Sequence, residues 1–400
     1  MKKILFQNAT LYKEDKWIED PIVKIEDGKI NSIESNSASL ASSVDQVFVY
    51  PNHVKIVPGF IDIHIHGVEN GDVMDGTVTS LELMKRALPK EGTTSFLATT
   101  ITQTTEKKHK ALSQVKNVMT NSLSFGAEIL GVHLEGPFLC AKRAGAQPKE
   151  YIKTPSIDMF YEFYQTAGNQ IKLVTLAPEE EMGIDLVREL KKLGIIPAIG
   201  HSDANYEQTR EAVIAGVTHA THVCNGMTGI HHRDIGILGG VLLHAEIIAE
   251  LIVDGIHVSP EMVKLIYKNK GAKGIILITD SMRAKGLVDG EYDLGGQTVT
   301  VKDKRATLKD GTLAGSIVKM NEAVKNMIAF SGCTFEEAIQ MATLNPAKQL
   351  RLHDRKGSLS VGKDCDLVVL DDDFEVVQTF VKGKVVYESS LKEGRNHEYH

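Results

Sequence analysis

The chain has 400 residues, of which 42% are hydrophobic and 24% charged, so it can bury a large core in one domain and add a smaller domain. Its formal net charge of −7 argues against a surface that binds nucleic acid or anionic lipid. The first residues, MKKILFQNATLYKEDKW, contain no apolar run long enough for a signal peptide, and no 18-residue apolar stretch follows. The cysteines are far apart and form no C-x-x-C pair, so we expect reduced thiols in a cytoplasmic protein: Cys140, Cys224, Cys333 and Cys365.

The two ends of the chain resemble each other and differ from the middle. Residues 1–57 contain strand-like segments such as KILFQNATLY and PIVKIEDGKINSI, the second with an Asp-Gly pair typical of a hairpin turn. The segment after Gly357 repeats this pattern in DCDLVVLD, FEVVQTFVKG and KVVYES. We therefore predict a small β-sandwich domain built from both termini, residues 1–57 and 357–400.

Between these ends, apolar segments alternate with helical ones. Eight apolar runs of strand length occur at residues 60–66, 95–101, 128–135, 172–177, 195–201, 218–223, 247–254 and 274–280. They are continuous runs rather than strict alternations, as in strands covered on both faces. Eight strand–helix units in about 220 residues fit an α/β (β/α)8 TIM barrel over residues 58–356 better than a doubly wound sheet, although strand number alone does not separate the two.

Helix-capping signals support the alternation. Asp203 is expected to cap a helix that stops at Gly216, and Ser259 followed by a proline has the pattern of an N-cap with proline in the first turn. The segment Thr334–Glu337 has the spacing of a capping box, so a further helix is expected to begin there.

Two histidines in the first apolar run are candidate metal ligands. His64 and His66 are two residues apart on a strand, so both side chains leave the same face. Imidazole nitrogens are good ligands for a cation such as zinc. An isolated His-x-His pair is also compatible with two core or surface histidines, so the pair alone does not establish a metal site.

Four further polar residues stand at the ends of apolar runs, where an unpartnered carboxylate is costly to bury. Glu135 closes the third run, His201 the fifth, His222 the sixth and Asp280 the eighth. In a TIM barrel these strand ends converge on one pocket, so a metal centre accounts for all of them together.

The chemistry of the ligands suggests their roles. His201 and His222 are neutral nitrogen donors, and Glu135 has two oxygens that can bridge two cations. His64 and His66 would complete a second metal position. Asp280 remains as the base that takes a proton from a metal-bound water and returns one to a leaving nitrogen. No G-x-S-x-G motif supports a serine nucleophile.

The segments PGFIDIHIHG, GVHLEGPF, IGHSDA, THVCNGM, DGIHV and ILITDSM, in this order, resemble the amidohydrolase superfamily and, within it, the N-acetylglucosamine-6-phosphate deacetylases. The similarity runs from about residue 56 to 320. The glutamate in HLEGP is the most specific feature, because many relatives use a carboxylated lysine on the fourth strand and KLVTLAPE has none at its end. The resemblance implies attack of a metal-bound hydroxide on the acetyl group of N-acetyl-D-glucosamine 6-phosphate, with roles in amino-sugar catabolism and cell-wall recycling.

The resemblance also implies substrate contacts. Arg233 matches an arginine that meets the phosphate, and with its two neighbouring histidines it forms a cationic cluster. Gln147 stands where many members have histidine, so it can bond a sugar hydroxyl without adding charge. The implied substrate-binding residues are Ala146, Gln147, Asn225, Gly226, Arg233, His257, Leu313, Ala314 and Gly315.

Several alternatives stay open at this stage. The expected cofactor is one or two divalent ions, zinc first, with iron, manganese and cobalt as alternatives. The resemblance implies a homodimer acting on a small molecule, with no nucleic-acid or membrane partner. Two rival hypotheses are a relative that cleaves another N-acyl or cyclic amide, and a scaffold that has lost its metal. Arg233 and Glu135 argue against the former, and the retained ligand set argues against the latter.

Overall fold

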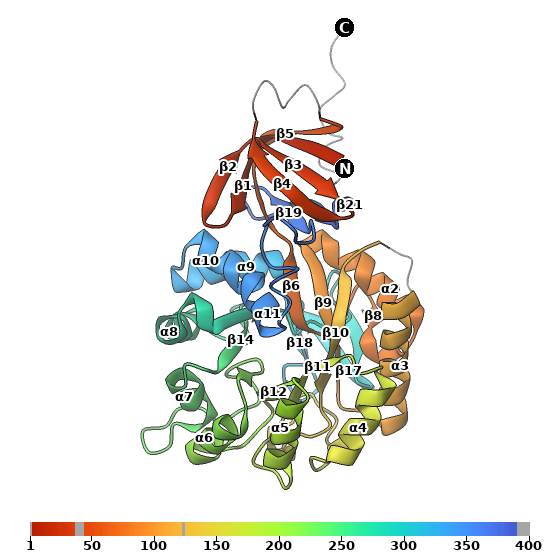
Figure 1. Ribbon diagram of the computed structural model, residues 1–400. Coiled ribbons are helices and arrows are strands. Elements are labelled where there is room, and N and C mark those ends of the chain that lie inside the picture. Colours follow the sequence, from red (N-terminus) through yellow and green to blue (C-terminus); the bar gives the residue numbers. More distant parts are fainter. Residues whose placement is uncertain (1, 37–43, 122–124, 390–400) are drawn as a thin grey trace.

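The computed structural model describes residues 2–36, 44–121 and 125–389. Parts of the predicted terminal domain, residues 37–43 and 390–400, lie outside this range. The main body of the protein is a barrel, and a small β domain lies above it in the view of Figure 1. No helix within the described residues is both long and apolar enough to cross a bilayer.

Eight parallel strands form the barrel wall, hydrogen-bonded in chain order. The strands are β6 (Phe60–Ile65), β9 (Thr93–Thr100), β10 (Glu128–Glu135), β11 (Ile171–Leu176), β12 (Ile196–Ile199), β13 (His219–Ala220), β14 (Ile248–Ile252) and β15 (Ile275–Ile278). A parallel bridge between Ile65 and Ser281 joins the first strand to the residues after the last. The predicted TIM barrel is therefore confirmed.

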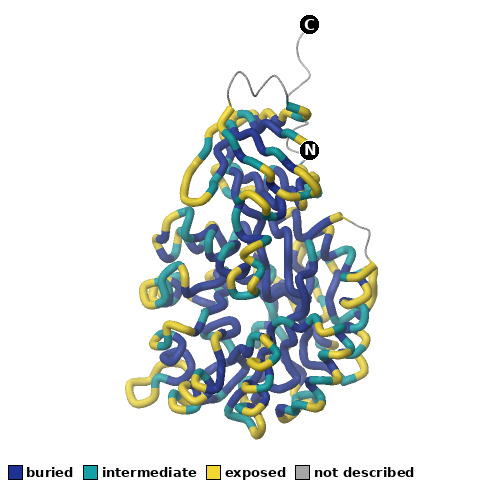
Figure 2. The backbone as a smooth tube through the Cα atoms, viewed as in Figure 1, coloured by how far each residue is buried: buried dark blue, intermediate teal, exposed yellow. Residues whose placement is uncertain are grey.

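Helices cover the outside of the barrel and bury apolar side chains against its strands, which are mostly dark blue in Figure 2. They are α2 (Val78–Ala87), α3 (Thr105–Asn121), α4 (Ile157–Thr166), α5 (Gly183–Lys192), α6 (Tyr206–Ala215), α7 (Gly236–Leu243), α8 (Pro260–Lys270), α9 (Met320–Ser331), α10 (Phe335–Ala342) and α11 (Leu344–Gln349). The caps predicted at Ser259 and Thr334 are present, and Gly216 ends α6.

The predicted cap of α6 is wrong by two residues. Asn205, not Asp203, accepts the backbone N–H of Gln208, and the Gln208 side chain completes a capping box. The carboxylate of Asp203 instead pairs with Lys142 and with Arg143, at 2.7 Å from the arginine Nε. Because the Asp203 carboxylate is paired with these two cations, Asn205 caps the helix instead.

Strands from both ends of the chain form one hydrogen-bonded sheet beside the barrel. In spatial order the strands are β21 (Lys384–Glu388), β20 (Val376–Val381), β19 (Leu367–Leu370), β5 (Gln46–Pro58), β1 (Lys2–Lys13), β3 (Pro21–Glu26) and β4 (Lys29–Ser35), with β2 (Lys16–Glu19) paired to β1. Phe6, Phe48 and Phe380 meet in its core with ring centroids 5.5–5.7 Å apart. The sequence boundaries of this domain at residues 57 and 357 stay a prediction.

Two short sheets were not predicted. β7 (Gly67–Val68) pairs with β8 (Gly71–Asp72) just after β6, and an insertion after β15 forms β16 (Gly290–Leu294), β17 (Gln297–Lys302) and β18 (Arg305–Thr307). The insertion has its own apolar core, which includes Leu294 and Ile101. It therefore packs against the end of the barrel where the predicted ligands lie.

Candidate metal centre

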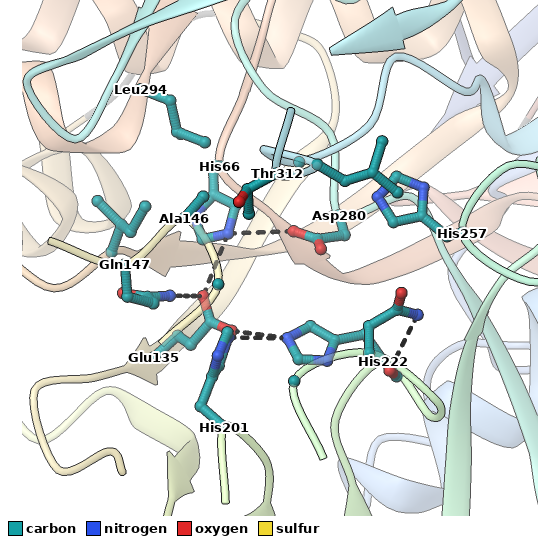
Figure 3. A pocket seen from close by; sticks show the side chains of 16 residues that line it. His66, Glu135, Ala146, Gln147, His201, His222, His257, Asp280, Leu294 and Thr312 are labelled. Carbon is teal, nitrogen blue, oxygen red and sulfur yellow. Dashed lines mark hydrogen bonds and ion pairs between the residues drawn. The ribbon is translucent and has the colours of Figure 1, made fainter. Parts of the chain in front are cut away.

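The carboxyl ends of the barrel strands bring the predicted ligands together (Figure 3). His64 lies within β6 and Glu135 ends β10, whereas His201, His222 and Asp280 each lie two residues beyond their strands. Parallel strands of a barrel end at the same rim, so these side chains point into a common space.

One cluster consists of Glu135, His201 and His222, all buried. The Nε2 atoms of both histidines lie 3.2 Å from Oε1 of Glu135 and 3.0 Å from each other. Two ligands on bonds of about 2.0–2.1 Å around a tetrahedral ion lie about 3.3 Å apart. Three donor atoms at this spacing fit a divalent cation with little adjustment.

A second cluster consists of His64, His66 and Asp280, also buried. Oδ1 of Asp280 lies 3.4 Å from Nε2 of His64 and 3.2 Å from Nε2 of His66. Glu135 reaches this cluster through Oε2, which lies 3.3 Å from Nε2 of His66. One glutamate therefore faces both clusters with different oxygens, which is the arrangement expected of a bridging ligand.

The fit to a cation also rests on a buried atom without a hydrogen bond. Nε2 of His64 is fully buried and has no hydrogen-bond partner among the described residues. Its nearest charged neighbours are carboxylate oxygens of Asp280 and Glu135, the latter at 3.7 Å. Buried polar atoms are rarely left without a partner, so this atom is suited to a metal ion.

The electrostatics of the cluster favour positive charge. Burial lowers the pKa of His64, but the charges of Asp280, Glu135 and Glu250 outweigh it and raise that pKa well above its usual value. For the Asp280 carboxylate, burial acts in the other direction and raises the pKa. The charge of His64 and the hydrogen bond from His66 outweigh burial and lower the pKa of Asp280 overall. The surroundings thus stabilise a cation and keep Asp280 ionised.

The backbone is strained at three of these residues. The φ values are 45° at His201, 30° at His222 and 48° at Asp280. They lie in the left-handed region, which residues other than glycine rarely adopt. The predicted strands at 195–201, 218–223 and 274–280 consequently end earlier than expected. A left-handed residue turns the chain away from the strand and aims its side chain across the barrel mouth.

A cavity of about 220 Å³ opens above the two clusters. Most residues with a predicted role line it: His66, Glu135, Ala146, Gln147, His201, His222, Asn225, Gly226, His257, Asp280, Leu313 and Gly315. His64 is fully buried and does not line the cavity, and Ala314 is buried in the core of the inserted sheet. Arg233 lies on an exposed loop outside this lining, with its guanidinium 2.8 Å from Nε2 of His232.

Gln147 uses its amide on the protein itself. Its Nε2 donates to Oε2 of Glu135 at 2.8 Å, and its Oε1 accepts the backbone N–H of Thr102 at 2.7 Å. The two bonds fix the orientation of the amide, because one end must donate and the other accept. Gln147 therefore orients the carboxylate of Glu135, a role that the sequence did not suggest.

Gly226 and His257 have clear local reasons for their identity. A Cβ on Gly226, whose φ is +58°, would lie 2.9 Å from Nδ1 of His201, so any side chain there would displace the His201 ring. Nδ1 of His257 lies 2.7 Å from Oδ2 of Asp254, so Nε2 is the ring nitrogen that remains for another partner.

Sequence reasoning missed several residues around the site. Ile101, Leu294 and Thr312 line the cavity, the second from the unpredicted β16. Lys108 on α3 is fully buried and donates to the carbonyl oxygen of Glu135 at 3.0 Å, and burial lowers its pKa to about 7. Glu250 lies behind His64. A charged residue inside the apolar run IIAELIVD was the available signal for Glu250.

Comparisons with known proteins agree with this geometry. The amidohydrolase family profile matches residues 56–386. N-acetylglucosamine-6-phosphate deacetylase of Bacillus subtilis (strain 168) is 45% identical over 394 residues, covering 96% of this chain and 98% of that protein. The crystal structure of N-acetylglucosamine-6-phosphate deacetylase from Thermotoga maritima has a TM-score of 0.85 at 37% identity, covering 96% of this chain and 100% of that one. A Mycobacterium smegmatis N-acetyl-D-glucosamine-6-phosphate deacetylase with one aspartate changed to alanine, in complex with N-acetyl-D-glucosamine-6-phosphate, has a TM-score of 0.88 at 27% identity, covering 96% and 99%.

Proposed function

The chain belongs to the amidohydrolase family, and from that premise we propose that it hydrolyses N-acetyl-D-glucosamine 6-phosphate to D-glucosamine 6-phosphate and acetate. The observation that carries the proposal is a pair of ligand clusters at one cavity, which Glu135 of the first joins through its contact with His66, and of which the second contains Asp280. Relatives that cover nearly the whole chain carry that activity in their names.

The family implies a divalent metal, and we propose zinc. Glu135, His201 and His222 would hold the tighter ion, and His64 with His66 a weaker one that shares Glu135. When bound, a divalent cation lowers the pKa of a coordinated water from about 15.7 towards about 7 and polarises the amide carbonyl.

The remaining steps belong to side chains. Asp280 accepts a proton from the water while the water oxygen bonds to the acetyl carbon. It then passes a proton to the amide nitrogen as the C–N bond breaks. Its lowered pKa supports the first role, since an ionised carboxylate is needed to accept the proton. His257, held by Asp254, and Asn225 are placed to orient the sugar hydroxyls.

The phosphate of the substrate needs a cationic side chain beside the cavity. Among the described residues that line it there is no lysine or arginine. We infer a homodimer in which the loop with Arg233 of one copy approaches the cavity of the other. A cytoplasmic location is consistent with the four unpaired cysteines, all of which the structure describes.

The same observation favours a second candidate, hydrolysis of an N-acyl or cyclic amide without phosphate. Acetate release from N-acetylglucosamine with and without the 6-phosphate decides between them, using metal-loaded protein and Asp280→Asn as the background. We expect activity on the phosphorylated sugar that disappears on chelation and returns with zinc. Equal activity on both sugars would favour the second candidate, and release no faster than the background would sink both.

A further inference from the structure

A buried carboxylate lies behind the metal centre without taking part in the proposed reaction. Glu250 is in the middle of β14, is 0% exposed and does not line the cavity. Its neighbours on the strand, Ala249 and Leu251, are apolar and fully buried. A charged side chain at such a position is retained only where its oxygens find donors.

Both oxygens of Glu250 have donors from the metal centre or its support. Oε2 lies 3.0 Å from Nδ1 of His64 and accepts the backbone N–H of His222 at 3.3 Å. Oε1 lies 2.8 Å from Nε2 of His219. One carboxylate therefore contacts the side chain of a ligand in one cluster and the backbone of a ligand in the other.

The hydrogen bonds fix which nitrogens carry protons. The amide nitrogen of Gln349, on α11, can only donate, and it lies 3.1 Å from Nδ1 of His219. Nδ1 of His219 must then accept, so its Nε2 carries the proton that goes to Glu250. Glu250 in turn accepts from His64, which places the proton of that ring on Nδ1.

In the neutral ring, the form in which imidazole binds a metal, the consequence is an unprotonated Nε2 on His64. This is the buried atom without a hydrogen bond, and it faces carboxylate oxygens of Asp280 at 3.4 Å and Glu135 at 3.7 Å. A lone pair opposite two anionic oxygens is unfavourable unless a cation lies between them. The tautomer that Glu250 selects is therefore the one that a metal requires.

The other histidines differ in this respect. Nδ1 of His201 lies 2.9 Å from the carbonyl oxygen of Arg143, and Nδ1 of His66 and of His222 has no partner within the described ranges. Among these four histidines, only His64 has a carboxylate at Nδ1, the nitrogen that faces away from the clusters. Carboxylates in this position orient the ring and increase the basicity of the ligand.

We propose that Glu250 is a positioning residue for the second metal site, which holds the ring and tautomer of His64, and that His219 and Gln349 hold Glu250 in turn. The inference rests on the metal centre of the proposed function. It adds a four-residue relay from the outer helix α11 through β13 and β14 to β6.

The test measures cobalt(II) and zinc binding by the chelated, purified full-length protein, using titration calorimetry and the visible spectrum of bound cobalt. The variant is Glu250→Gln, which keeps shape but presents a donor where His64 needs an acceptor. We expect the second ion to bind 10- to 100-fold more weakly, with a changed cobalt spectrum, while the first ion keeps its affinity. Glu250→Asp, which retains the carboxylate, should recover part of the affinity.

Glu128→Gln is the matched control. Glu128 begins β10 at the other end of the barrel, where it pairs with Arg355 and Lys356, so its loss should lower thermal stability without altering metal binding. If Glu250→Gln is insoluble, Gln349→Leu decides, since Gln349 is only half-buried. This variant should weaken the second ion by about 3- to 10-fold, because only the outer link of the relay is lost.

The outcomes separate the two proposals. A wild-type protein that binds no divalent ion would refute the metal centre itself. A wild-type protein that binds one ion, or a Glu250→Gln protein with two ions at wild-type affinity and spectrum, would overturn the role of Glu250 alone. Unchanged affinities in Gln349→Leu would overturn the relay in the same way.

Discussion

Replacing Asp280 by asparagine separates proton transfer from metal binding. Oδ1 of Asp280 lies 3.2 Å from Nε2 of His66, and an asparagine oxygen can occupy the same place. What disappears is the ability to accept and return a proton. Losing a positioned acid–base group lowers kcat by roughly 10²–10⁴-fold, which corresponds to about 2.7–5.4 kcal/mol at about 1.36 kcal/mol per tenfold. The cluster of Glu135, His201 and His222, which we propose holds the tighter ion, does not include Asp280, so an ion in that cluster should stay bound.

Steady-state deacetylation with metal quantified in each sample measures both effects. Asp62→Asn is a suitable control, because Asp62 is a fully buried carboxylate near the same strands whose Oδ2 accepts from the Thr279 hydroxyl and which does not line the cavity. It should retain near-normal kcat in the folded fraction. If Asp280→Asn keeps its metal and a kcat close to wild type, the proton-transfer role of Asp280 is wrong.

Three further predictions follow from the site. His201→Ala should lose its bound metal, whereas the double variant of His64 and His66 should bind fewer ions but retain some. Full metal content in His201→Ala, measured by elemental analysis, would contradict the ligand assignment. Arg233→Ala should raise KM for the phosphorylated sugar and spare kcat, and an unchanged KM would remove Arg233 from the phosphate site. In the metal-free protein, burial lowers the pKa of His66, but bonds to Asp280 and Glu135 raise it overall from 6.5 to about 9. Because the folded pKa is the higher one, this stabilisation is complete below about pH 6.5 and lost as pH rises through about 9, so the Tm of chelated protein should fall over that range, and fall less in His66→Asn.

The barrel was predictable because its strands are covered on both faces. A strand with apolar neighbours above and below is a continuous apolar run, and the eight runs appear in the sequence in the order in which the strands pair. The inserted β16–β18 sheet escaped prediction, since its strands alternate buried and exposed residues over only a few positions. Such short patterns do not differ from those of an ordinary loop.

The clustering of the candidate ligands was predictable for a related reason, and the contacts that support them were not. His201, His222 and Asp280 are polar residues at the ends of apolar runs, where a barrel places its active site. The role of Gln147 depends on contacts with Thr102 and Glu135, from distant segments of the chain, that sequence spacing does not report. Glu250 is a polar residue within a run rather than at its end, and the donors it meets come from three other strands or loops.

The left-handed residues show how the site is held before any cation binds. Each left-handed residue costs on the order of 1–3 kcal/mol, so the surrounding structure must offset the strain. It does so through backbone hydrogen bonds: the N–H of Asp280 donates to the carbonyl of His64 at 2.8 Å, and the carbonyl of His201 accepts from Cys140 at 2.8 Å. His222 donates its N–H to Glu250 at 3.3 Å. These bonds belong to the protein alone, so the strained conformations do not need a metal to persist. A cation at these clusters would therefore meet side chains whose backbone is already fixed, and little of its binding energy would be spent on ordering them.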